Sequence, residues 1–316
     1  MIRLHSFEHG TLSTTESPAS CKPTGAPAKT WIEVTNPEPG DFVTLVEGLG
    51  LHELALEDAL APGHPPKLED FGDHLFLIAH TPDADDEGQT RKIAIFFSKA
   101  WIVTVVRLRV DVLDEVSERV RRNPGRFLTS PDTLAHAILD HMTDGFERII
   151  DSLMDRAEAL EEQAAHGPGG ASLHAILQLR REVAHLARVV RSQRDMTHAL
   201  AWTTHAALSK KLQPYLRDVY DHLLRVYEHL EGVREGLLAA REAYLSATNN
   251  RLGEVMRTLT VITTIMMPLT LVTGFFGMNF QHIPGLHSPL GFWATAGCMA
   301  ALGVGMFAWF RKRGWF

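Results

Sequence analysis

Cysteine and excess positive charge are both scarce in this 316-residue chain. Its two cysteines, Cys21 and Cys298, lie far apart, which argues against a disulfide framework or a zinc cluster and is compatible with a reducing cytoplasm. A net charge of -7 argues against a nucleic-acid partner and suits a domain that meets cations. The sequence contains no Walker-type phosphate loop, so we expect no nucleotide partner. Histidines and acids are scattered without a nucleophile–base pair, so the chain is predicted not to be an enzyme.

Charge is missing altogether from two stretches near the C-terminus. One runs from Leu259 to Phe276, and the other covers residues 290–310. An uncharged run of about 18 or more residues can cross a bilayer as a helix. We therefore predict transmembrane helices at 258–280 and 290–310, embedded in a lipid bilayer and joined by an external loop at 281–289.

Lysine and arginine are distributed unevenly around the two spans. Arg251 and Arg257 precede the first span, a basic tail at 311–316 follows the second, and the connection between the spans has neither residue. Because basic residues remain on the cytoplasmic side, both termini are expected in the cytoplasm. The N-terminus also lacks the apolar core of a signal peptide. We expect a two-span protein of the cytoplasmic (inner) membrane.

The polar part of the chain divides by pattern into four regions. They are an irregular lead-in (1–29) to which we assign no function, an α/β domain (30–110), a helical region (111–211) and a stalk helix (212–257). Strand-like runs such as KIAIFF and WIVTVV predict a mixed sheet, and helical periodicity predicts long helices covering it. No strong breaker follows Pro214, so the stalk helix should continue into the first span, with Gly232, Gly236 and Gly253 as possible bending points. The predicted fold class is α+β.

One face of the first span carries only small, hydroxylated or thioether side chains. Counting back from Gly277 by three or four residues gives Gly274, Thr270, Met267, Thr263, Thr260 and Met256. Such a stripe is common where membrane helices pack together, and it also suits a helix that faces a water-filled axis. Pro268 favours the second interpretation, because it frees the Thr264 carbonyl, which a hydrated lumen or a threonine hydroxyl can satisfy.

The segment YLSATNNRLGEVMRTLTVITTIMMPLTLVTGFFGMNF, residues 244–280, closely resembles the signature of the CorA family of divalent-cation channels. The triplet Gly277-Met278-Asn279 at the outer end of the first span is the hallmark of that family. Two upstream stretches, PYLRDVYDHL and HPPKLEDFGDHLFLIAH, are also similar to the family. The resemblance covers most of the chain beyond residue 30.

This resemblance implies a homopentamer with a cytoplasmic funnel, in which five first spans surround the pore and the second spans form an outer ring. Gly277, Met278 and Asn279 would form the selectivity filter for hydrated Mg²⁺, with Co²⁺ or Ni²⁺ as further cargo, moving down the electrochemical gradient. Threonines would contact the hydration water, while methionine and leucine rings would close the path by dewetting. The implied pore-lining residues are Met256, Leu259, Thr260, Thr263, Met267, Thr270 and Gly274.

The resemblance also implies gating by cytoplasmic Mg²⁺ that is bound between subunits and holds the closed state. Asp218 matches the regulatory position on the stalk, with Asp221 beside it and Glu242 further along. The neighbouring subunit's ligand is expected among the remaining acidic candidates, Asp83, Asp85 and Asp86. The alternative is that these acids are ordinary solvated residues, with Asp218 and Asp221 paired to a nearby arginine.

The loop after the triplet departs from the magnesium-type pattern. Where many members carry Met-Pro-Glu-Leu, this chain has Ile283-Pro284-Gly285-Leu286, so its only titratable side chains are His282 and His287. The neutral loop looks more like the ZntB branch, and both histidines are candidate Zn²⁺ ligands. A Zn²⁺ transporter, coupled or uncoupled to protons, is therefore an alternative, and a membrane-anchored sensor or scaffold without transport is a remote one.

Overall fold

The computed structural model describes residues 2–8, 11–16, 29–38, 48–83, 85–86, 88–128, 130–165, 173–278, 288 and 290–315. The chain forms two compact units. The first comprises Met1–Gln163 and Ala171–Arg241, and the second comprises Ala164–Gly170 and Glu242–Phe316. The first unit contains a sheet and helices, and the second contains the two membrane-competent helical segments.

A seven-stranded mixed sheet organises the first unit, in the order β2-β1-β3-β7-β6-β5-β4. Its strands are β1 Ile2–Glu8, β2 Thr11–Glu16, β3 Lys29–Thr35, β4 Lys67–Asp70, β5 Leu75–Pro82, β6 Thr90–Phe97 and β7 Trp101–Val106. Strands β3 and β7 pair in parallel, and the other pairs are antiparallel. The predicted mixed sheet is confirmed, and the two strand-like runs KIAIFF and WIVTVV form the antiparallel neighbours β6 and β7.

The N-terminal segment differs from the prediction. Residues 2–16 were expected to be irregular, but β1 and β2 form a hairpin that extends the sheet beyond β3. The Ser6 and Ser13 hydroxyls lie 2.6 Å apart across the two strands, and His5 stacks on Trp31 with ring centroids 4.9 Å apart. A segment rich in serine and threonine has the composition of a loop. However, β-branched threonine also suits a strand, and cross-strand hydroxyl pairs stabilise the strand pairing.

One apolar core cluster joins the sheet to helix α2 (Glu53–Leu60) and includes Leu56, Ile32, Phe76 and Phe96. Lys92 fixes the end of α2 by donating to the carbonyls of Asp58 at 2.8 Å and Ala61 at 2.5 Å. These carbonyls have no intrahelical partner at a helix C-terminus, so a lysine is a suitable cap.

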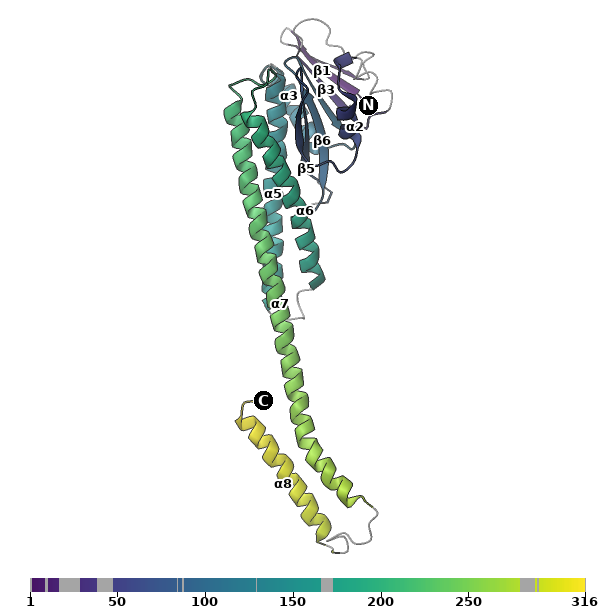
Figure 1. Ribbon diagram of the computed structural model, residues 1–316, viewed down its shortest axis with the longest axis vertical. Helices are drawn as coiled ribbons and strands as arrows, with labels where there is room; N and C mark the ends of the chain where they lie inside the picture. Colours follow the sequence, from purple (N-terminus) through teal and green to yellow (C-terminus); the bar gives the residue numbers. More distant parts are fainter. Residues whose placement is uncertain are drawn as a thin grey trace. The chain divides into compact units, whose positions relative to one another are not determined.

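Long helices cover the sheet, as predicted (Figure 1). The helices that follow the sheet in this unit are α3 Asp111–Arg122, the short α4 Pro124–Phe127, α5 Pro131–Ala165, α6 Leu173–Trp202 and the first part of α7 Gln213–Phe276. Among them, α6 contacts β4 and β5. Helix α6 is joined to β5 by the Gln193 side-chain oxygen, which accepts the His80 backbone N–H at 2.7 Å. Burial lowers the pKa of the His80 imidazole, whose Nε2 donates to the His64 carbonyl at 2.8 Å.

Helix α7 is 64 residues long and runs without interruption from the stalk sequence into the first apolar span. Gly232, Gly236 and Gly253 lie inside it, and a Cβ atom added at any of them would have no neighbour within 4 Å. The predicted continuity is therefore confirmed. The last helix, α8, spans Gly291–Lys312.

Candidate functional site

Among the described residues, two helices are long and apolar enough to cross a membrane, α7 and α8. Only 6% of the apolar window of α7 and 0% of that of α8 are buried within the chain. Large side chains such as Met267, Leu271 and Phe292 are 68%, 74% and 72% exposed. Apolar surface on this scale is not left in water by a soluble monomer, so these helices require lipid or other copies of the chain around them.

Part of the predicted stripe lines one elongated hollow on α7, with a volume of about 810 Å³. Thr263, Met267, Thr270 and Gly274 contribute to it, together with Met278 of the triplet. Met256, Leu259 and Thr260 are also exposed but lie outside its lining. Isoleucine, leucine and phenylalanine from adjacent faces share the hollow, so its surface is mainly apolar with two hydroxyl positions.

Each threonine in the apolar part of α7 donates its hydroxyl proton to a carbonyl of the same helix. Thr260, Thr263 and Thr270 donate to the carbonyls four residues earlier, at 2.7, 2.9 and 2.8 Å. Because a hydroxyl has one proton and two lone pairs, each threonine then offers only acceptor sites to its surroundings. Thr264 donates in the same way to the Thr260 carbonyl at 2.7 Å.

The carbonyl that Pro268 deprives of its usual donor is that of Thr264. Within the described part of α7, the threonine hydroxyls donate to other carbonyls, those of Tyr244, Glu254, Met256, Leu259, Thr260, Met266 and Thr270. A threonine hydroxyl was one of two expected partners for the Thr264 carbonyl, and this structure does not provide it. Water in a lumen is the remaining expected partner.

Gly277 ends the helix within a crowded turn. Its N–H donates to the Thr273 carbonyl at 2.9 Å, and the Met278 N–H donates to the Phe275 carbonyl at 3.3 Å. A Cβ at Gly277 would lie 3.1 Å from the Thr273 oxygen, closer than ordinary van der Waals contact. Glycine therefore allows the chain to close this turn. Asn279, His282 and His287 lie outside the described residues.

Helix α8 packs beside α7 within the second unit. A Cβ at Gly303 would contact the Leu269 side chain at 3.8 Å, and a hollow of about 480 Å³ between the helices is lined by Thr273, Gly277 and Thr295 among others. Aromatic residues mark both ends of α8, with Trp293 at one end and Trp309 at the other, where Arg313 lies 4.8 Å from its ring. Aromatic and basic residues at helix ends are typical of membrane interfaces.

The acidic loop candidates are paired within the chain. Asp83 and Asp85 contact the Arg91 guanidinium at 2.7 and 2.5 Å, and the Asp86 carboxylate accepts the Gly88 N–H at 3.1 Å. Burial pushes the pKa of Asp83 upward, but the hydrogen bonds from Arg91 and the Asp85 amide outweigh it and leave that pKa below its usual value. A cation at this loop would have to compete with Arg91.

On α7, Asp218 pairs with His222 at 3.8 Å, and His222 contacts Glu147 of α5 at 3.1 Å. The alternative pairing of Asp218 with a nearby arginine is absent from the described contacts, and Arg217 lies 5.1 Å from the Trp202 ring. Asp221 and Glu242 are exposed. The regulatory candidates stay a prediction, because the described residues of one chain include no group of three His, Cys, Asp or Glu placed to hold a metal ion.

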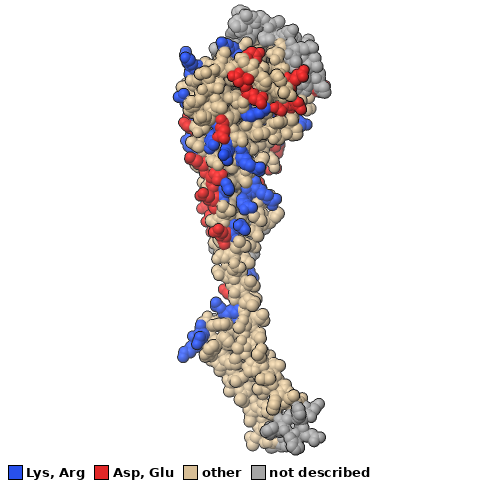
Figure 2. All heavy atoms as spheres, in the orientation of Figure 1, with Lys and Arg blue, Asp and Glu red and all other residues tan. Residues whose placement is uncertain are grey.

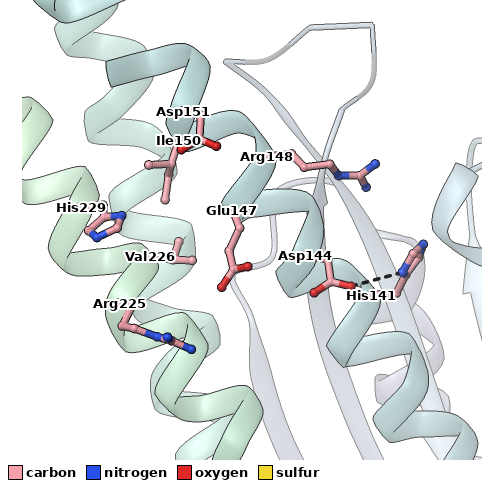
Figure 3. A pocket seen from close by; sticks show the side chains of 9 residues that line it. All are labelled: His141, Asp144, Glu147, Arg148, Ile150, Asp151, Arg225, Val226 and His229. Carbon is pink, nitrogen blue, oxygen red and sulfur yellow. Dashed lines mark ion pairs between the residues drawn. The ribbon is translucent and has the colours of Figure 1, made fainter. Parts of the chain in front are cut away.

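A cavity of about 620 Å³ between α5 and α7 adjoins this pair and was not predicted (Figure 3). It is lined by His141, Asp144, Glu147, Arg148, Ile150, Asp151, Arg225, Val226 and His229. Glu147 from α5 and Arg225 from α7 face the same space, and the buried His141 ring lies 3.6 Å from Asp144. The sequence does contain a signal for this cavity. Both helices carry titratable residues at spacings of three and four, and this spacing places those residues on one face of each helix.

The comparisons with known proteins agree with this architecture. A family model described as CorA-like Mg²⁺ transporter protein matches residues 28–312. YfjQ of Bacillus subtilis is 30% identical over 286 residues, covering 90% of this chain and 89% of that protein. The cobalt/magnesium transport protein CorA of Thermotoga maritima is 29% identical over 291 residues, covering 90% and 83%. The solved CorA magnesium transporter of Methanocaldococcus jannaschii has a TM-score of 0.87 at 21% identity, covering 100% and 99%.

The sheet-and-helix unit and the two membrane-competent helices define a two-span membrane protein. The chain belongs to the CorA family, and it is a divalent metal ion transporter. This confirms the resemblance recognised in the sequence, and it confirms the prediction that the chain is not an enzyme.

Proposed function

We propose that the protein conducts hydrated Mg²⁺, and also Co²⁺ or Ni²⁺, through a homopentameric pore lined by the stripe of α7. It would lie in the cytoplasmic membrane with both termini inside, and a ring of Asn279 side chains would select the ion at the outer mouth. A divalent cation that crosses a potential of about 100 mV gains on the order of 4.6 kcal/mol. Transport therefore needs no hydrolysis to drive it.

The observation that carries this proposal is the orientation of the threonine hydroxyls. Water molecules around a cation direct their hydrogens outward, so a hydrated ion presents donors to the pore wall. Thr263 and Thr270 have committed their own protons to helix carbonyls at 2.9 and 2.8 Å, and they offer acceptors. Mg²⁺ loses its water reluctantly, so a wall that binds the hydration shell suits it better than a wall that strips it.

A flux experiment with a matched pair of variants tests the pore wall. Thr270→Val removes an acceptor from the stripe, and Thr264→Val removes a hydroxyl with the same backbone hydrogen bond from another face of the helix. In proteoliposomes, we expect Thr270→Val to reduce Mg²⁺ uptake roughly tenfold, as the loss of one hydrogen bond to a charged species would. Thr264→Val should leave uptake near wild type. Equal effects of the two variants would refute this pore face.

The identity of the ion is tested in the same vesicles with Mg²⁺, Co²⁺, Ni²⁺ and Zn²⁺ in parallel. The acid-free sequence Ile283-Pro284-Gly285-Leu286 with its flanking His282 and His287 favours Zn²⁺ as the second candidate cargo. If Mg²⁺ is the cargo, replacing both histidines by alanine leaves its uptake unchanged. Asn279→Ala should abolish uptake of every ion, and an unchanged flux through this variant would contradict the pore assignment.

A further inference from the structure

A second polar hollow, of about 660 Å³, lies at the end of the first unit where α3 ends and α5 and α7 begin. It is lined by Arg119, Arg126, Phe127, Ser130, Thr133, His136, Ala137, Asp140, Ser209, Lys211, Leu212 and Tyr215. None of these residues belongs to the pore or to the acidic regulatory candidates. Its volume falls in the range of small-molecule binding sites.

The charge of this hollow is opposite to that of the whole chain. Three cations line it, Arg119, Arg126 and Lys211, against one described carboxylate, Asp140, whereas the chain as a whole carries -7. No ion pair joins any of the three cations to a carboxylate in the described ranges. Figure 2 shows lysine and arginine side chains gathered at the corner of the first unit where α7 begins. Unpaired cations converging on a concavity attract an anion.

The start of helix α5 does not itself supply the anion site. Asp132 in its first turn is 1% exposed, and its carboxylate accepts hydrogen bonds from the Thr133 N–H at 2.9 Å and the Ser209 N–H at 2.8 Å. The bond to Ser209 also ties the segment before α7 to α5, and Lys211 follows two residues later. The Ser130 hydroxyl donates to the same carboxylate, so it has no proton left for an anion. The fold thereby holds Lys211 at the hollow, while the three cations remain available to a ligand.

Aromatic rings also line the hollow, and a site for a simple anion would not need them. Tyr215 is 60% exposed and lies edge-on to His136 with ring centroids 5.8 Å apart, and Phe127 also contributes to the lining. An exposed aromatic ring beside cations can stack on a nucleobase whose phosphates the cations hold. Inorganic phosphate alone would make no use of these rings.

We propose that this hollow binds a nucleoside polyphosphate, with Arg119, Arg126 and Lys211 holding the phosphates and Tyr215 stacking on the base. Arginine and lysine are the usual phosphate ligands, and the Thr133 and Ser209 hydroxyls can complete the contacts. The site contains no Walker loop, and its residues come from four separate segments. For this reason the sequence pattern led us to expect no nucleotide. The site binds without hydrolysis and is independent of the pore.

The test uses the full-length protein in detergent and measures ATP binding by isothermal titration calorimetry, with a chelator keeping the nucleotide free of Mg²⁺. We expect saturable binding that weakens with added salt. Lys211→Glu should weaken it at least about tenfold, the loss of one charge-assisted contact. The adjacent Lys210→Glu, which changes charge equally outside the lining, should change affinity less than about twofold. Arg119→Glu and Arg121→Glu form a second matched pair on α3.

Two further ligands test the assignment to a nucleotide. Tyr215→Ala should weaken ATP binding while leaving inorganic tripolyphosphate binding unchanged, because only ATP has a base to stack. A polyglutamate peptide should bind more weakly than ATP. Absence of ATP binding to the wild type, equal effects in both members of each matched pair, or equal binding of polyglutamate would overturn the proposal. Circular dichroism of each variant checks that it folds.

Discussion

Two lysines in one side-chain cluster show how neighbouring residues can differ in chemistry. Burial alone would lower the pKa of Lys67, but its hydrogen bonds with Asp58 at 2.5 Å and Glu69 at 2.7 Å raise that pKa overall. Lys92 donates to backbone carbonyls instead, and burial lowers its pKa to about 8. A carboxylate partner therefore decides which of these two lysines remains charged in weakly alkaline solution.

At pH 8, we predict that acetic anhydride modifies Lys92 before Lys67, because about half of the Lys92 amines are then neutral nucleophiles. The folded-state pKa lies below the ordinary lysine value of 10.5, so the unfolded chain holds this proton more tightly. Through this group, the free energy of unfolding should increase as the pH rises from about 8 towards 10.5. Peptide mass spectrometry after brief labelling gives the order of modification. Faster labelling of Lys67 would contradict the assignment.

Packing explains why the first residue of the triplet, Gly277, is a glycine. Gly277→Ala would place a methyl group 3.1 Å from the Thr273 carbonyl, and we expect it to cost about 1 kcal/mol of stability. The measurement is thermal unfolding of the detergent-solubilised protein. Gly253→Ala is the control, since an added Cβ there meets nothing within 4 Å. Unchanged unfolding of Gly277→Ala would show that the turn has room for a side chain.

At the scale of elements, α7 is destabilised by several interior glycines that make no packing contact. Gly232→Ala and Gly236→Ala should each raise stability by roughly 0.5–1 kcal/mol, because alanine loses less backbone entropy in a helix and meets no neighbour here. Thermal unfolding of each variant measures this gain. A loss of stability would mean that these positions bend away from helical geometry.

Elements with strong periodicity were predictable, and those that depend on tertiary pairing were not. Helix α5 and strands β6 and β7 follow from their apolar patterns and from the stop signals around them. The hairpin β1–β2 and the short β4 were missed, because their polar sequences become strands only when paired with a neighbour. The basic hollow was missed for a related reason: Arg119 and Lys211 meet only after α3, α5 and α7 have packed together.

At the scale of the whole molecule, the regulatory acids are the part of the predicted site that one chain cannot complete. The stripe lies on α7 and the triplet follows it directly in the sequence, so a motif and a helical period are enough to predict them. A site shared between subunits leaves no periodic pattern in the sequence, and its residues come together only in the assembled oligomer. Asp218 nevertheless gives a clean probe, because its single described ion pair is exposed and weak, and its replacement should hardly disturb the fold.

Asp218→Lys should abolish the protection against proteolysis that Mg²⁺ gives, if the ion bridges subunits at this position. Clustered carboxylates repel each other until a hard cation joins them, and a lysine removes that need. The readout is limited proteolysis of the full-length protein over a series of Mg²⁺ concentrations. Glu228→Lys, an exposed acid on the same helix, should retain the protection. Unchanged Mg²⁺ dependence of Asp218→Lys would place the site elsewhere.

The hydroxyls of α7, each bonded to its own backbone, have a consequence for which ions are refused. An anion in water is surrounded by molecules that direct their oxygens outward, and such a shell needs donors from the wall. Thr260, Thr263 and Thr270 have none left to give. A pore lined by these side chains would exclude chloride and phosphate without a single charged residue in its membrane section, through the direction of its hydrogen bonds alone.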